Sequence, residues 1–342
     1  GVPGGFDFER EAYFQRLGAV GSVLGAVSAK PDARPLPPVA EVVAAIDRAR
    51  NAMTERIIAV IGGSTGAIAA ALITGKRGQI AENDNETWRA AGIYHLISIS
   101  GLHMMLAAGL FFWTARLIFA LFPEWKPRLH PKKIAALIAM AGATAYDIFS
   151  GSEVATERSL IMTLVMFGAI LADRPALAMR NLAISALLIL AVRPETVLGP
   201  SFQMSFGAVA ALVAFGEAER RWRERHPHAD AAGQDSLMHR AGRIALAFVA
   251  TSLIAGLATA PFQAFHFHRL NPYGVLGNAL AVPLCSFLVM PAALIGVLTY
   301  PLGLDAPAFW LMGQGIDAIS RAAAMVGSLS GAVAPTGRFG AG

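Results

Sequence analysis

Apolar residues in this chain fall into long continuous blocks, and several blocks approach the length of about 20 residues that a helix needs to cross a lipid bilayer. Hydrophobic residues make up 55% of the 342 residues, and charged residues make up only 15%. Soluble domains carry about 25% charged residues. The sequence therefore predicts an all-α fold, a polytopic helical membrane bundle, and it excludes a disordered or nucleic-acid-coating basic protein.

Hydropathy and turn signals indicate about eight spans. The expected spans cover residues 95–121, 132–150, 158–173, 178–192, 199–216, 243–264, 273–300 and 306–328. Asn271-Pro272 and Pro283 predict an irregular backbone in the seventh span. The eighth span carries Gln314, Asp317 and Arg321 at helical spacing, so one of its faces is expected to be buried in protein or to face water.

Lysine and arginine residues in the connecting segments predict the orientation of the bundle, because cytoplasmic loops are enriched in them. One set of alternate loops holds twelve basic residues, between 126 and 133, at 174 and 180, and between 220 and 243, and the other set holds three, Arg158, Arg193 and Arg269. The first set is therefore expected in the cytoplasm. Both the small N-terminal segment and the C-terminus are then expected to be extracytoplasmic.

Four regions are expected along the chain. Residues 1–56 form an extracytoplasmic remnant, a proline-rich linker and an amphipathic helix, residues 57–94 form an interfacial or peripheral helix and a polar loop, residues 95–330 form the transmembrane domain, and residues 331–342 form a C-terminal tail. Glycines interrupt the apolar stretch at 57–74, which favours a helix on the membrane surface or packed against the bundle over a further span.

Polar side chains open the first long apolar block, in the sequence HLISISGLH at 95–103. Its polar members are His95, Ser98, Ser100 and His103, and such groups at membrane depth must be paired or face water. Three interpretations remain open: a histidine at the interface with the other bonded to a neighbouring helix, a polar lining at the mouth of a pathway, or a metal site. No HExxH motif accompanies the histidines, and no GxSxG turn accompanies the serines, so neither a metal nor a catalytic residue is predicted.

Further polar groups lie at the ends of later spans, on the side expected to be extracytoplasmic. They are Arg158, then Gln203 and Ser205 in PSFQMSF at 200–206, and Gln263 and His266 in PFQAFHFH at 261–268. The neighbouring aromatic rings are typical of the interfacial belt of a membrane protein, and they also offer flat surfaces on which bases can stack.

The segment HLISISGLHMMLAAGLFFW at 95–113 resembles the ComEC family of bacterial competence proteins. Matching segments follow the family order: GGFDFEREAYFQRLGAVGSVLG at 4–25, ALITGKRG at 71–78 and SFQMSF at 201–206. The resemblance implies a channel in the cytoplasmic (inner) membrane that passes one strand of incoming DNA into the cytoplasm during natural transformation, with residues 95–330 as the competence domain. Family members often carry a nuclease domain as well. No HxHxDH motif occurs in this chain, so the chain is not expected to be an enzyme. Its ends, Gly1-Val2-Pro3 and Gly340-Ala341-Gly342, are expected to be cut from a longer polypeptide.

A DNA strand carries one negative charge per nucleotide, so its path through lipid needs water, polar groups and basic side chains. The residues expected to line that path are His95, Ser98, Ser100, His103, Arg158, Gln203, Ser205, Gln263 and His266. The expected partners are single-stranded DNA, membrane lipid, a cytoplasmic DNA motor and extracytoplasmic DNA-binding proteins, and no cofactor is expected. Three other interpretations remain open: a small-molecule or ion permease that uses the same polar groups, an intramembrane hydrolase that uses the histidines or serines, and a structural scaffold without a water-filled path.

Overall fold

The structure is a computed structural model that describes residues 8–14, 17–22, 24–26, 37–122, 130–226 and 237–336. Helices dominate these residues, and the prediction of an all-α helical membrane bundle is confirmed. The elements are α1 (Phe8–Phe14), α2 (Pro38–Ile61), α3 (Gly63–Thr74), α4 (Glu82–Ala90), η1 (Tyr94–Leu96), α5 (Gly101–Leu121), α6 (Pro131–Ser150), α7 (Val154–Leu171), α8 (Met179–Val192), η3 (Pro194–Leu198), α9 (Pro200–Arg225), α10 (Leu237–Phe267), β1 (Arg269–Leu270), α11 (Gly274–Leu284), the π-helical turn η4 (Cys285–Val289), α12 (Met290–Thr299), η5 (Tyr300–Leu302), α13 (Ala306–Gly327) and β2 (Ala334–Pro335).

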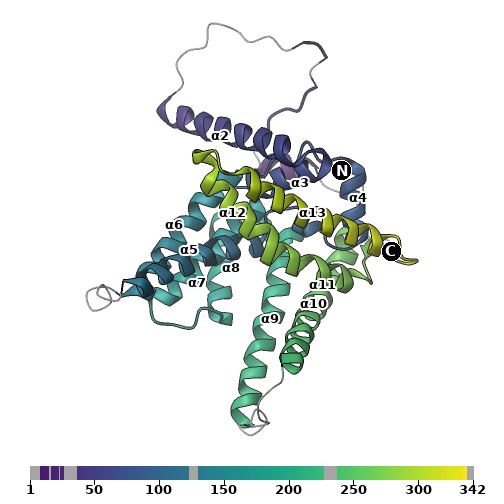
Figure 1. Cartoon of the computed structure of the whole chain (residues 1–342). Helices are drawn as coiled ribbons and strands as arrows, with labels where there is room; N and C mark the ends of the chain where they lie inside the picture. The colour runs from purple at the N-terminus through teal and green to yellow at the C-terminus, as the bar shows by residue number, and fades with distance from the viewer. Residues whose placement is uncertain are drawn as a thin grey trace.

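Six helical stretches in the described residues are long and apolar enough to cross a membrane. They are α5, α6, α7, α9, the part of α10 from Leu246 to Phe267, and the stretch Gly274–Leu302 that contains α11, η4 and α12. Of the remaining two expected spans, α8 is a shorter apolar helix of 14 residues, and α13 falls outside this set. Figure 1 shows α9 and α10 extending side by side away from the other helices, and these two helices contact each other.

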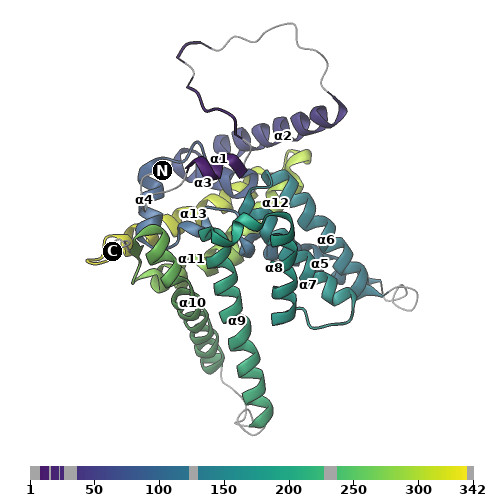
Figure 2. The same cartoon turned by 180° about the vertical axis from the view of Figure 1, so that it is seen from behind.

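Helix α13 differs from the span expected at 306–328. It runs across the upper part of the molecule beside α2, as Figures 1 and 2 both show, and it contacts α2, α3 and α4. Its buried residues form one stripe that includes Phe309, Met312 and Ile316, whereas Gln314 and Arg321 are exposed. This division between an apolar and a polar face is typical of a helix that packs on one side only.

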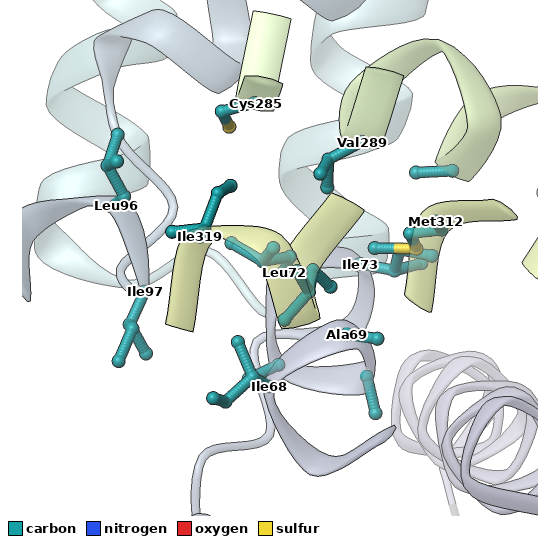
Figure 3. Packing of buried hydrophobic residues seen from close by; sticks show 14 of the residues in the cluster. Ile68, Ala69, Leu72, Ile73, Leu96, Ile97, Cys285, Val289, Met312 and Ile319 are labelled. Carbon is teal, nitrogen blue, oxygen red and sulfur yellow. The ribbon is translucent and has the colours of Figure 1, made fainter. Parts of the chain in front are cut away.

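Helix α3 is buried on all sides from Gly66 to Thr74 and stands at the centre of the larger hydrophobic core. In Figure 3, Ile68, Leu72 and Ile73 of this helix lie among Leu96, Ile97, Val289, Met312 and Ile319 from segments far apart in the sequence. The 12 residues of α3 are too few to cross a bilayer, which needs about 20. The core of the protein is therefore built where α3, α13 and the irregular seventh span meet.

A second core joins α5, α6 and α7. Small residues of α6, Ala136, Ala139 and Ala143, lie against Met104 and Phe167 with almost no exposed surface. Small side chains let helix backbones approach closely, which is the main source of helix association in a bilayer because lipid supplies no hydrophobic drive.

Two expected helix ends differ from the observed ones for local reasons. The helix expected from residue 95 begins at Gly101, because Ser100 takes an extended conformation and His103 bonds back to it. The helix expected to end at 216 continues to Arg225, because its polar end is held by pairs one turn apart, among them Glu219–Arg223 at 2.7 Å. Hydropathy marks the end of an apolar block, not the end of a helix.

Candidate functional site

The turn before α5 uses Ser100 and His103 to begin the helix. The backbone N–H of Ser100 donates to Nδ1 of His103 at 3.2 Å, and the Ser100 hydroxyl lies 3.1 Å from the same atom. A backbone amide can only donate, so Nδ1 carries no proton and the neutral ring is protonated at Nε2. His103 has no exposed surface. Its first role is therefore to satisfy one of the free N–H groups at the start of α5.

The other ring nitrogen of His103 faces the seventh span. Nε2 of His103 lies 3.5 Å from Sγ of Cys285, the first residue of the π-helical turn η4. Single π turns inside helices occur frequently at functional sites, and this one lies between Pro283 in α11 and Pro291 in the first turn of α12. Sequence analysis predicted an irregular seventh span but did not single out Cys285, whose position opposite His103 is visible only in the fold.

His95 and Ser98 lie in the approach to this turn and do not join it. His95 is exposed on η1, and Ser98 is half-buried after it. The approach is held in place by a neighbouring contact, since the guanidinium of Arg89 lies 4.5 Å from the ring centre of Tyr94. The structure thus brings together only two of the four polar residues of HLISISGLH.

A second group of polar residues joins α7, α9 and α10, and we call Arg158, Ser201, Gln203 and His266 the α7–α9–α10 polar cluster. Nη1 of Arg158 donates to the hydroxyl of Ser201 at 2.5 Å. Nε2 of His266 lies 2.8 Å from Oε1 of Gln203, and the Gln203 amide nitrogen donates to the carbonyl of Val197 at 3.1 Å. Of the four residues in these two bonds between helices, Arg158, Gln203 and His266 were predicted for this site, and Ser201 lies two positions before Gln203 in SFQMSF.

Arg158 has hydrogen-bonding capacity that the described residues leave unused. Its Nε is buried and has no hydrogen-bond partner among them. The nearby acid Glu157 is paired with Arg193 at 2.9 Å instead, and no described carboxylate pairs with Arg158. A guanidinium presents a planar fork of N–H groups that matches a phosphate or a carboxylate. The cluster therefore contains one positive charge with an unused donor at Nε, a combination that suits an anion.

The remaining two predicted residues lie beside the cluster without bonding to it. Gln263 donates to the hydroxyl of Thr259 on its own helix at 3.4 Å, and Ser205 is half-buried on α9. The turn before α5 and the cluster are neighbours, because a Cβ at Gly101 would lie 3.8 Å from the hydroxyl of Ser159 on α7. The described residues contain no group of three histidine, cysteine or acidic side chains able to hold a metal ion.

Comparisons with known proteins agree with the resemblance. The sequence model of the family described as Competence protein matches residues 72–342. The chain is 29% identical over 227 residues to Competence protein ComA of Neisseria gonorrhoeae, which is 66% of this chain and 29% of that protein. It is 25% identical over 236 residues to ComE operon protein 3 of Bacillus subtilis, with 69% and 26% covered, and 27% identical over 302 residues to Recombination protein 2 of Haemophilus influenzae, with 86% and 35% covered.

The chain thus spans about a third or less of the length of each of these relatives. No solved structure matches it. The family model covers well over half of the chain, including the turn before α5, the π-helical turn and the α7–α9–α10 polar cluster. The chain is therefore a helical membrane protein that belongs to the Competence protein family.

Proposed function

We propose that this chain forms a membrane channel that translocates single-stranded DNA into the cytoplasm during natural transformation. The observation that carries the proposal is Arg158, a cation at the end of a membrane helix whose Nε has no partner among the described residues. Arg158 is half-buried, and a positive charge at membrane depth without a counter-ion is expensive, so that such residues commonly mark the path of an ion or substrate. A phosphate of the DNA backbone supplies the missing counter-ion.

The surroundings of Arg158 suit a nucleic acid strand. Ser201, Gln203 and His266 add hydroxyl, amide and imidazole groups, and Phe265 and Phe267 on either side of His266 are 59% and 48% exposed. Aromatic rings that are free to stack bind bases without regard to sequence, and basic groups follow the backbone. This combination supports a path for DNA more than a compact site for one small solute.

The proposed direction of transport follows from the distribution of basic residues. Arginines and lysines gather at the ends of the helices opposite the α7–α9–α10 polar cluster, and this distribution supports an orientation with the cluster on the outer side of the cytoplasmic membrane. Incoming DNA then meets Arg158 first. In this proposal the chain is a pore and not an enzyme, extracytoplasmic DNA-binding proteins deliver the strand, and a cytoplasmic motor draws it in.

Uptake of labelled DNA tests the proposal, in cells that carry the full-length parent protein with single substitutions. One charge-assisted contact contributes about 1.5–3 kcal/mol, so Arg158→Gln is expected to lower uptake about tenfold or more. Arg193→Gln is the matched control, because Arg193 is already paired with Glu157. Normal uptake by Arg158→Gln, at a membrane level equal to that of the parent, would show that Arg158 does not meet DNA. The single variant Gln203→Ala tests a further lining residue of the cluster in the same assay.

Orientation is tested separately by labelling single cysteines in a Cys285→Ala background. Asn83 in α4 and Arg180 in α8 are both exposed and lie on opposite sides in the proposed topology. A membrane-impermeant maleimide added to intact cells is expected to label Asn83→Cys and not Arg180→Cys. Labelling of both positions, or of Arg180→Cys alone, contradicts the proposed direction.

A further inference from the structure

A pocket of about 450 Å³ lies at the ends of α5 and α6, where these helices meet the residues after α7. Its lining includes Arg116 and Phe119 of α5, His130, Lys132 and Lys133 at the start of α6, and Asp173. By the distribution of basic residues this is the cytoplasmic end of the bundle, opposite the α7–α9–α10 polar cluster.

The pocket carries an excess of positive charge. Lys133 pairs with Asp173 at 2.7 Å, and this contact, with Lys132 and His130 nearby, holds the pKa of Asp173 below its ordinary value. Arg116 and Lys132 are exposed and form no ion pair or hydrogen bond with any described residue. Two cations thus remain available for an anion among the described lining residues, which contain one acid, Asp173.

The start of α6 adds to this attraction. The helix begins at Pro131, which has no N–H, and no side chain caps it. The N–H groups of Lys133 and Ile134 turn back to the carbonyl of His130. The helix dipole places partial positive charge at this end, which favours an anion there.

An apolar groove continues from the pocket along the surface between α5 and α6. It has a volume of about 260 Å³ and is lined by Phe111, Thr114, Ala115, Ile118 and Phe119 of α5 and by Ile138 of α6. Phe119 lines both hollows, so the groove and the pocket lie next to each other. The span from Phe111 to Phe119 measures about 12 Å along the helix at 1.5 Å per residue.

The groove faces outward from the bundle. Leu117, Ile118 and Ile138 around it are 59%, 43% and 41% exposed, as expected of side chains in contact with lipid. Its far end is closed by the ring of Phe111, which rests on Gly142, where a Cβ would lie only 2.2 Å from the ring. A hydrocarbon chain lying in the groove therefore enters it from the membrane and ends at the basic pocket.

We propose that an anionic phospholipid of the cytoplasmic leaflet binds here, with its phosphate on Arg116 and Lys132 and one acyl chain in the groove between α5 and α6. Basic pockets between membrane helices on the cytoplasmic side are suited to anionic lipid headgroups. Single-stranded DNA would use the two cations but leave the apolar groove empty, because its backbone has no long apolar chain. The inference rests on the orientation given under the proposed function, but it concerns the other end of the bundle and does not require DNA transport.

Native mass spectrometry of the purified full chain tests this site, with lipid removed and then dioleoyl phosphatidylglycerol or dioleoyl phosphatidylcholine titrated in. Phosphatidylglycerol is expected to bind more tightly. The double variant Arg116→Gln with Lys132→Gln is expected to bind it about thirtyfold more weakly, the factor for about 1 kcal/mol per basic side chain near an anionic surface. Arg174→Gln with Arg180→Gln is the matched control, because both residues are exposed at the same end but lie outside the pocket.

A second variant tests the groove while leaving the charges in place. Thr114 is exposed and lines the groove, so Thr114→Trp fills it and is expected to weaken binding of phosphatidylglycerol without changing binding of inorganic phosphate. Equal affinity for both lipids in the parent chain, or no loss in either variant, overturns the proposal. Displacement of the lipid by an oligothymidylate that Thr114→Trp still binds normally would assign the pocket to DNA instead.

Discussion

Arg50 of α2 joins the ends of two other helices, and its removal should loosen the layer that α2 forms on the bundle. Nε and Nη2 of Arg50 donate to the carbonyl of Thr74, the last residue of α3, at 3.1 and 2.7 Å. Nη2 also donates to the carbonyl of Ser150, the last residue of α6, at 3.3 Å. The last carbonyls of a helix have no partner within it, and Thr74 and Ser150 are only 0% and 1% exposed.

The magnitude follows from these contacts. A hydrogen bond to a charged group contributes about 1.5–3 kcal/mol. The Thr74 carbonyl receives two good bonds and the Ser150 carbonyl one long bond, so Arg50→Ala is expected to lower the free energy of unfolding by about 3 kcal/mol. Solvent screening is small, because the Arg50 side chain is only 18% exposed. Arg50→Lys keeps the charge but loses the planar fork of N–H groups, so it should lower the free energy of unfolding by about half as much.

Equilibrium unfolding of the purified chain in mixed detergent micelles, followed by tryptophan fluorescence, measures this effect. Arg48→Ala is the matched control, because Arg48 lies on the same helix, is exposed and has no bond to any described residue. Substitution of such a residue changes stability by about 0.5 kcal/mol or less. If Arg50→Ala is no less stable than Arg48→Ala, α2 is not held by these carbonyls and the packing of α2 on α3 and α6 is wrong.

Three further outcomes are expected. The Arg56 guanidinium, 2.8 Å from Asp305, holds the pKa of that carboxyl below its ordinary value. The pair therefore stabilises the fold above about pH 4, and this effect is lost as pH falls through the lowered pKa. In Asp305→Asn, the free energy of unfolding should fall less steeply as the solution is made acidic. Gly142→Ala should destabilise the α5–α6 contact by about 1–3 kcal/mol because its Cβ meets the ring of Phe111, and combining it with Phe111→Leu should recover part of the loss in the same unfolding assay. Cys285 is 2% exposed and should react with a thiol reagent only after unfolding, as mass spectrometry of the labelled chain can show.

The membrane helices could be predicted from the sequence because hydropathy acts along the chain. The expected span 132–150 corresponds to α6, Pro131–Ser150, and 178–192 to α8, Met179–Val192, within one residue at each end. The direction of α13 could not be predicted in this way. Its composition allows a span, and only the contacts of its apolar stripe with α2, α3 and α4 place it across the bundle.

The polar residues could be singled out by type from the sequence, but their partners could not. Gln203 and His266 lie 63 positions apart, and His103 and Cys285 lie 182 positions apart. No periodicity connects such positions, because their approach depends on how whole helices pack. For the same reason, Ser201 was not predicted as a site residue. Its hydroxyl binds Arg158, and it belongs to the SFQMSF segment on which the resemblance partly rests.

The turn before α5 and the α7–α9–α10 polar cluster differ in what they can offer to a DNA strand. His103 uses both ring nitrogens within the fold and has no exposed surface, so it has nothing left to offer a passing strand. Arg158 keeps an unused donor, and the α9–α10 pair beside it has only 6% of each spanning window buried. Motion of a weakly packed pair breaks few contacts, whereas exposing His103 requires its bonds to Ser100 and Cys285 to break together. The proposed channel therefore opens between α7 and α9 before it opens at the start of α5, and cysteines introduced at Ser201 should react with an impermeant reagent during DNA uptake under conditions in which Cys285 stays protected.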